Sequence, residues 1–82
     1  MPVQNKFVSL SFTHENKSDL KSIVRSVTDL TYDSLETFTE PLEDEPGFLT
    51  DVYLTGNVED IVRSVREAYE SKKLDCGWTV VE

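Results

Sequence analysis

The chain has 82 residues and a mass of 9.4 kDa, enough for one small hydrophobic core but not two, so we expect a single domain over residues 1–82. Hydrophobic residues make up 38% and charged residues 29%, which is typical of a globular chain, and no apolar run approaches the ~20 residues of a membrane span. The net charge of −8 disfavours direct binding to nucleic acid, and the single cysteine, Cys76, excludes an internal disulfide.

The first third of the chain predicts a strand followed by a helix. Within residues 7–13, apolar Val8, Leu10 and Phe12 alternate with hydroxyl-bearing Ser9, Ser11 and Thr13, the period of two of a half-buried strand. The spacing then becomes helical, with apolar residues at i, i+3, i+4 and i+7: Leu20, Ile23, Val24 and Val27. Asn16 and Ser18 are candidate N-caps, and we expect this helix to end near Asp29.

The middle of the chain predicts two strands joined by an acidic loop. Residues 32–39 are rich in Tyr, Phe and Thr but are interrupted by acids, which is typical of an edge strand. Residues 40–47 contain two prolines, a glycine and four acids, so we expect a loop. Residues 48–55 alternate again, with Phe48, Val52 and Leu54 on one face and Leu49, Asp51, Tyr53 and Thr55 on the other.

The last third predicts a second helix and a short final strand. Asn57 is a candidate N-cap, with Asp60 three residues further on. A helical apolar stripe then runs to about Lys73: Val58, Ile61, Val62, Val65 and Tyr69. Gly77 leads into a strand over residues 78–81.

An internal repeat supports one topology. The sequence Ile-Val-Arg-Ser-Val occurs at 23–27 and again at 61–65, once in each predicted helix. Two βαβ halves related in this way predict a ferredoxin-like βαββαβ sandwich of the α+β class, with a four-stranded antiparallel sheet of order 4-1-3-2 and two helices on one face. The strands over 7–13 and 48–55 would be central. We expect the core to contain Val8, Leu10, Phe12, Val24, Val27, Val52, Leu54, Ile61, Val62 and Val65.

The residues that could support catalysis are few. His14 is the only histidine, and we interpret it as a solvated loop residue; Cys76 has no evident base beside it. The acids in 40–47 do not follow the ligand spacing of a calcium-binding loop, and no glycine-rich phosphate loop is present. We therefore expect no enzymatic activity, no metal site and no cofactor.

The negative charge is concentrated in the middle of the chain. No Lys or Arg lies between Arg25 and Arg63, whereas residues 26–62 contain ten acids. Such a block is either a solvated face that keeps the protein soluble or a surface matched to a basic partner. On the second interpretation, the predicted partner-binding residues are Glu36, Glu40, Glu43, Asp44, Glu45 and Asp51.

These features favour a protein-interaction or inhibitor protein whose acidic edge binds a larger basic protein. Nucleic-acid-binding proteins present basic grooves, so the partner could be one of them and the acidic edge a nucleic-acid mimic, as in some virus-encoded inhibitors of host defence. The N-terminal residues contain no apolar core of a secretion signal, so we expect a cytoplasmic protein with no membrane partner.

The alternative is a small-ligand-binding regulatory module, as in ferredoxin-like domains of the ACT type, acting through the open sheet face or a dimer interface. The strand parity places Phe7 and Tyr53 on that open face. Two aromatics there resemble the base-stacking platform of an RNA-recognition motif, but the basic residues and the glycine-aromatic pattern of that motif are absent. The sequence leaves a homodimer open.

Overall fold

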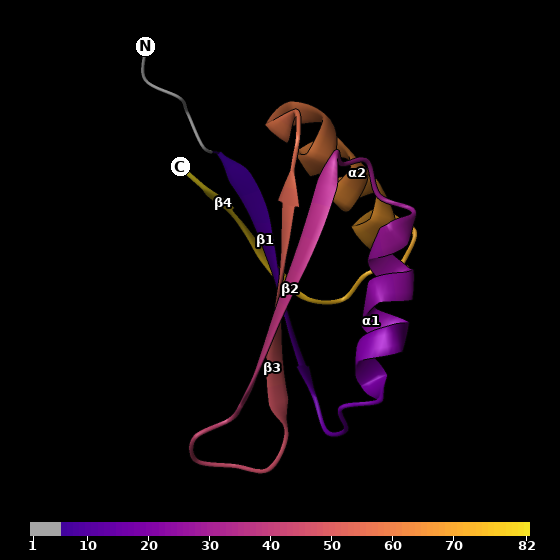
Figure 1. Cartoon of the computed structure of the whole chain (residues 1–82). Helices are drawn as coiled ribbons and strands as arrows, with labels where there is room; N and C mark the ends of the chain where they lie inside the picture. The colour runs from indigo at the N-terminus through magenta and orange to yellow at the C-terminus, as the bar shows by residue number, and fades with distance from the viewer. Residues whose placement is uncertain (1–5) are drawn as a thin grey trace.

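Two helices and four strands follow one another in the order expected. The computed structural model describes residues 6–82, so the N-terminal residues 1–5, in which the sequence shows no signal core, lie outside it. The elements, in chain order (Figure 1), are β1 (Phe7–His14), α1 (Asp19–Thr28), β2 (Ser34–Pro41), β3 (Phe48–Thr55), α2 (Val58–Glu70) and β4 (Gly77–Val81).

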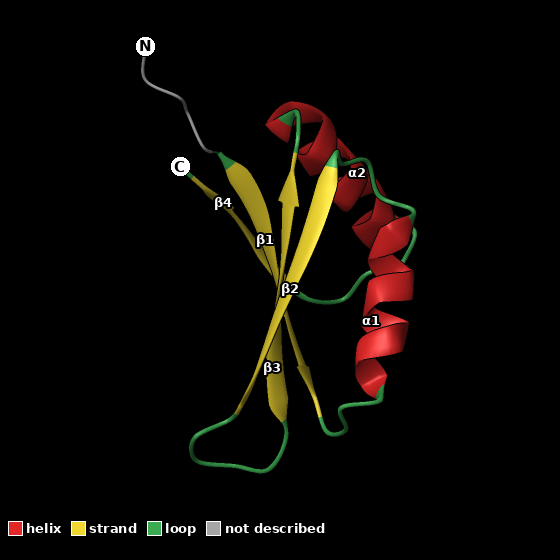
Figure 2. Cartoon of the chain, viewed as in Figure 1, coloured by secondary structure: helices red, strands yellow, loops and turns green. Residues whose placement is uncertain are grey.

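The four strands form one sheet in which every neighbouring pair is antiparallel. The strand order is β2-β3-β1-β4, which reads 4-1-3-2 when counted from the β4 edge. Both helices lie on the same face of this sheet, and no described element covers the other face (Figure 2). The α+β class, the antiparallel sheet and the central position of β1 and β3 are confirmed, and the arrangement is that of a ferredoxin-like βαββαβ sandwich.

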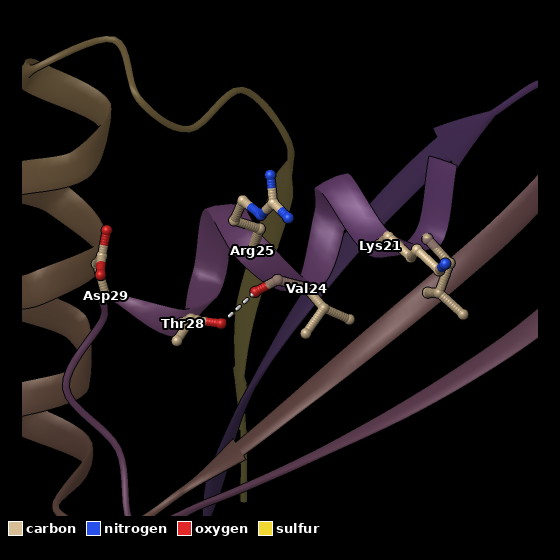
Figure 3. A pocket seen from close by; sticks show the side chains of 6 residues that line it. Lys21, Val24, Arg25, Thr28 and Asp29 are labelled. Atoms are coloured by element: carbon tan, nitrogen blue, oxygen red, sulfur yellow. Dashed lines mark hydrogen bonds between the residues drawn. The ribbon is translucent and has the colours of Figure 1, made fainter. Parts of the chain in front are cut away.

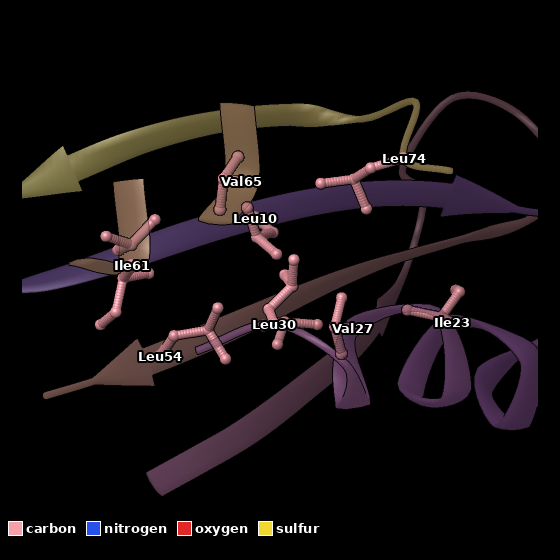
Figure 4. Close-up of a cluster of buried hydrophobic side chains, with 10 residues drawn as sticks. Leu10, Ile23, Val27, Leu30, Leu54, Ile61, Val65 and Leu74 are labelled. Carbon is pink, nitrogen blue, oxygen red and sulfur yellow. The ribbon is translucent and has the colours of Figure 1, made fainter. Parts of the chain in front are cut away.

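The core lies between the sheet and the two helices (Figure 4). The repeated sequence has the same role in both halves, because its Ile and its second Val are buried in α1 and again in α2. The buried apolar residues are Val8, Leu10, Ile23, Val27, Leu30, Val52, Leu54, Ile61, Val65 and Leu74. Val8 and Leu10 of β1 lie opposite Leu54 and Val52 of β3, so the two central strands supply the floor of the core.

Three predicted core residues are only partly buried: Phe12, Val24 and Val62. Val24 and Val62 are the first valines of the two repeats, so each follows the inward-pointing isoleucine by one position. One helical position is a rotation of about 100°, which turns these side chains toward the rim of the core. The positions that the predicted core omitted, Ile23, Leu30 and Leu74, are buried instead.

The predicted boundary of β2 was wrong by two residues. Tyr32 precedes the strand and packs against the core, while the Asp33 backbone N–H donates to the Thr55 carbonyl at 2.7 Å. This bond begins the β2–β3 pairing, which runs from Ser34 opposite Thr55 to Pro41 opposite Phe48. The loop therefore covers residues 42–47 rather than 40–47.

The caps of the two helices differ. Asn57 caps α2 as predicted, because its side-chain oxygen accepts from the Asp60 backbone N–H at 3.1 Å. Neither Asn16 nor Ser18 caps α1 with its side chain; instead, the Asp19 carboxylate accepts from the Asn16 backbone N–H at 3.1 Å. The second helix ends at Glu70, before the predicted Lys73, because Lys72 adopts a left-handed conformation with φ of 60°.

Candidate protein-binding surface

Three aromatic rings form a row across the open face of the sheet. Phe7 of β1 and Tyr53 of β3 meet edge to face, with ring centroids 5.0 Å apart. Tyr53 also contacts Phe38 of β2 at a centroid distance of 5.1 Å. Phe7 and Tyr53 are half-buried, but Phe38 is 53% exposed at the β2 edge. The row therefore ends in an aromatic ring that is open to solvent.

Carboxylates border this exposed ring. Asp51 lies directly opposite Phe38 on β3, and such paired side chains project from the same face about 5 Å apart. Glu36 and Glu40 lie two residues before and two residues after Phe38 on β2, so the strand alternation places them on that face too. Ser11 of β1 donates a hydrogen bond to Asp51 Oδ1 at 2.9 Å, which orients that carboxylate.

The remaining predicted acids lie in the loop between β2 and β3. Glu43, Asp44 and Glu45 are exposed there, at the end of the sheet where Glu40 also lies. The six predicted residues thus form two neighbouring groups: one on the open face around Phe38, and one in the loop beyond it. We refer to the two groups together as the acidic surface: Glu36, Glu40, Glu43, Asp44, Glu45 and Asp51.

The sheet contains acids but no lysine or arginine. The four strands contain no Lys or Arg, and their only acids are the three on the open face. The two ion pairs of residues 6–82 lie elsewhere: Lys6 with Glu82 at 3.2 Å, and Arg63 with Asp60 at 3.6 Å. The carboxylates around Phe38 are therefore not neutralised within the described part of the chain.

The sequence interpretation missed Phe38. It identified Phe7 and Tyr53 as open-face aromatics, and their contact confirms that they share a face. The signal for Phe38 was present in the alternation of residues 35–40, where Leu35, Thr37 and Thr39 take one face and Glu36, Phe38 and Glu40 take the other. Only the register with β3 shows which of these two faces is the open one.

The His14 side chain forms hydrogen bonds within the fold, so its interpretation as a solvated loop residue was wrong. It is the last residue of β1 and is half-buried. Its Nδ1 lies 2.8 Å from the Asn16 carbonyl oxygen, which can only accept, so Nδ1 carries the proton. Nε2 of the neutral ring then accepts from the Thr50 hydroxyl at 2.7 Å, and Thr50 accepts from Thr39 at 2.8 Å. Both ring nitrogens are occupied by structural bonds.

We expect Thr50→Val to lower the free energy of unfolding by about 1–3 kcal/mol, because it removes the hydroxyl of a fully buried residue and leaves the half-buried His14 Nε2 without its donor. Valine keeps the shape and the strand preference of threonine, so any decrease in the free energy of unfolding is due to the missing hydroxyl. Urea unfolding followed by circular dichroism measures it, with Thr13→Val, at an exposed position of β1 outside this network, as the matched control. An unchanged unfolding midpoint for Thr50→Val would contradict a structural role for this network.

Cys76 is partly buried beside Tyr69. The Cys76 backbone N–H donates to the Tyr69 hydroxyl oxygen at 3.1 Å, and that hydroxyl donates to Cys76 Sγ at 3.6 Å. Burial raises the pKa of the Cys76 thiol, and burial also raises the pKa of the Tyr69 hydroxyl. A raised thiol pKa reduces the thiolate fraction at neutral pH, which is the opposite of what nucleophilic catalysis requires.

A shallow groove of about 630 Å³ follows one side of α1. Leu20, Val24 and Thr28 line it at intervals of one helical turn, together with the charged residues Lys21, Arg25 and Asp29. In Figure 3 the Val24 side chain points away from the helix axis, and Thr28 donates a hydrogen bond to the Val24 carbonyl at 2.7 Å. The groove explains why Val24 is not buried.

No family model, curated protein or solved structure matches the chain. Within residues 6–82, no group of three or more His, Cys, Asp or Glu side chains is arranged to hold a metal ion. Among the same residues, neither helix is long and apolar enough to cross a membrane.

Proposed function

We propose that the protein is a non-enzymatic interaction module whose acidic surface binds a basic surface of a larger protein. The observation that carries this proposal is the set of unneutralised carboxylates around an exposed aromatic ring, on a sheet whose strands contain no Lys or Arg. Charged residues around a binding surface raise the association rate with an oppositely charged partner, while an exposed aromatic residue supplies apolar area that is buried on contact.

A nucleic-acid-binding protein suits this chemistry, because such proteins present Lys and Arg side chains to phosphates. Acids that meet those side chains would compete with nucleic acid for the same surface.

The cytoplasmic location stays a prediction. The proposal of a non-enzymatic role is supported by the structural bonds of His14 and by the raised pKa of the Cys76 thiol.

The test compares two variants of equal charge. The first removes four acids near the loop while keeping size and polarity: Glu40→Gln, Glu43→Gln, Asp44→Asn and Glu45→Gln. The matched control removes four exposed acids from the helical side: Asp29→Asn, Glu59→Gln, Glu67→Gln and Glu70→Gln. Both variants change the net charge equally, so a difference between them reports the location of charge rather than its amount.

Parent and variants are immobilised and incubated with an extract of the native cell at low and high salt. A protein retained by the parent and by the control, but not by the loop variant, is then purified for kinetic measurements. We expect its association rate to fall by about 10-fold in the loop variant at low salt, and the difference to shrink as salt rises toward ~0.5 M. If the loop variant associates as fast as the control at low salt, the four changed acids serve solubility and do not steer the partner, which contradicts the proposal.

A second candidate, a small-ligand-binding regulatory module, is favoured by the groove beside α1. Its lining combines apolar side chains with two basic residues, Lys21 and Arg25, and one acid, Asp29, and this excess of positive charge suits a small amphipathic acid. A ligand that binds only the folded state raises the melting temperature, so thermal unfolding across a set of carboxylate-bearing metabolites tests it. Loss of any such shift in Val24→Glu would assign the binding to the groove.

A further inference from the structure

We propose that the open face around Phe38 binds an arginine side chain of the partner, with the guanidinium stacked on the phenyl ring. This inference rests on the proposed function and names the chemical group that the same surface recognises. It depends on Phe38 and on the three carboxylates that border it, not on the loop acids.

The first argument is the geometry around the ring. Phe38 is 53% exposed, and Tyr53 supports it from the side with a centroid distance of 5.1 Å. A cation placed over an aromatic face is attracted by the electron density of that face. Around the ring, Asp51 lies across the strand pair, and Glu36 and Glu40 lie on either side along β2. A cation on the ring would therefore have acceptors within reach on three sides.

The second argument distinguishes arginine from lysine. A guanidinium is planar and weakly hydrated, so it can stack on a ring while its edge N–H groups donate to carboxylates in the same plane. An ammonium is a compact, strongly hydrated charge that loses more hydration over a ring and cannot donate along two edges at once. The Phe38 ring can stack on the planar guanidinium, and the carboxylates beside the ring can accept from its edge N–H groups. The site therefore fits arginine better than lysine.

The third argument concerns the other possible occupants. A second copy of the chain docked by its open face would bring the same carboxylates against each other, with no Lys or Arg on any strand to neutralise them. Nucleic acid would bring phosphates to those carboxylates. Charge complementarity therefore favours a basic protein segment over either alternative.

The test uses two peptides of equal length and charge, (Arg-Gly)4 and (Lys-Gly)4, titrated into the labelled full chain and followed by amide chemical shifts. In an extended peptide every second side chain lies on one face, so both peptides present their cations as a single row. We expect the arginine peptide to bind about 3- to 10-fold more tightly and to shift the amides of β2 and β3 around Phe38 and Asp51.

Phe38→Leu separates stacking from charge. Leucine keeps the apolar area but removes the aromatic face, so the preference for arginine should disappear while the weaker lysine binding stays the same. Val80→Ala, which trims an exposed apolar residue on β4, is the control and should leave both affinities unchanged. Because Phe38 and Val80 are both exposed, neither change removes a core contact, and the amide spectrum of the helices verifies the fold.

Equal affinities for the two peptides, or an arginine preference that survives Phe38→Leu, would overturn the arginine site. If both peptides still bind the parent equally and lose affinity in the four-acid loop variant, the acidic surface retains its proposed role and only the arginine inference fails. Shifts of the same β2 and β3 amides on raising the protein concentration without peptide would show that a second copy covers this face, which also overturns it.

Discussion

Leu10→Ala is expected to lower the free energy of unfolding by about 2–5 kcal/mol. Leu10 is fully buried on the central strand β1, where it lies opposite Val52 of β3 and Trp78 of β4. Truncation removes apolar contacts and leaves a cavity that a close-packed core fills only in part. Small domains are stabilised by only about 5–15 kcal/mol, so the loss is a large share of the total. Urea unfolding followed by circular dichroism measures the change.

The matched control for this change is Val24→Ala. Val24 was expected in the core, but it is only partly buried beside the α1 groove, and alanine also favours the helix. We expect its cost to stay below about 1 kcal/mol, within the range of surface substitutions that remove no core contact. If Val24→Ala costs as much as Leu10→Ala, the groove is filled in solution and the helix packs more closely on the sheet than described.

Gly56→Ala is expected to cost about 1–3 kcal/mol, because Gly56 adopts a φ of 141° that side-chain-bearing residues rarely take. It joins the end of β3 to the cap of α2. An added Cβ would lie 3.0 Å from the Asp33 backbone nitrogen, whose N–H donates to Thr55 at the start of the β2–β3 pairing. The substitution should therefore strain the turn and loosen the beginning of β2. Urea unfolding measures the overall cost, and hydrogen exchange at the Asp33 amide reports the local effect.

Gly77→Ala provides the comparison on the same residue type. Gly77 has no positive φ, and a Cβ there would meet no heavy atom within 4 Å. Alanine also restricts the unfolded chain, so we expect this change to be neutral or to stabilise by about 0.4–1 kcal/mol. Equal destabilisation by both substitutions would contradict the assignment of strain to Gly56.

The sequence by itself determined the features that depend on neighbouring residues. The alternation in 7–13 and 48–55 and the helical stripes around the repeat predicted β1, β3 and the two helices, since each pattern repeats within one element. Asn57 was recognised as a cap because its partner, Asp60, is three residues away. The repeat also made the topology predictable, because two equivalent βαβ halves can form one sheet in only a few ways.

Only the tertiary structure decided the features that join residues far apart in the chain. Leu30 and Leu74 lie outside the helices and are buried because loops return them to the core, which no helical or strand period predicts. His14 has a structural role because the pairing of β1 with β3 places its Nε2 2.7 Å from the hydroxyl oxygen of Thr50, 36 positions away in the sequence. The acidic surface was predicted as a stretch of charge, but its arrangement around Phe38 depends on the β2–β3 register. A shift of one residue in that register would turn Phe38 and its flanking glutamates to the other face, so the pairing of the strands decides what the open face presents.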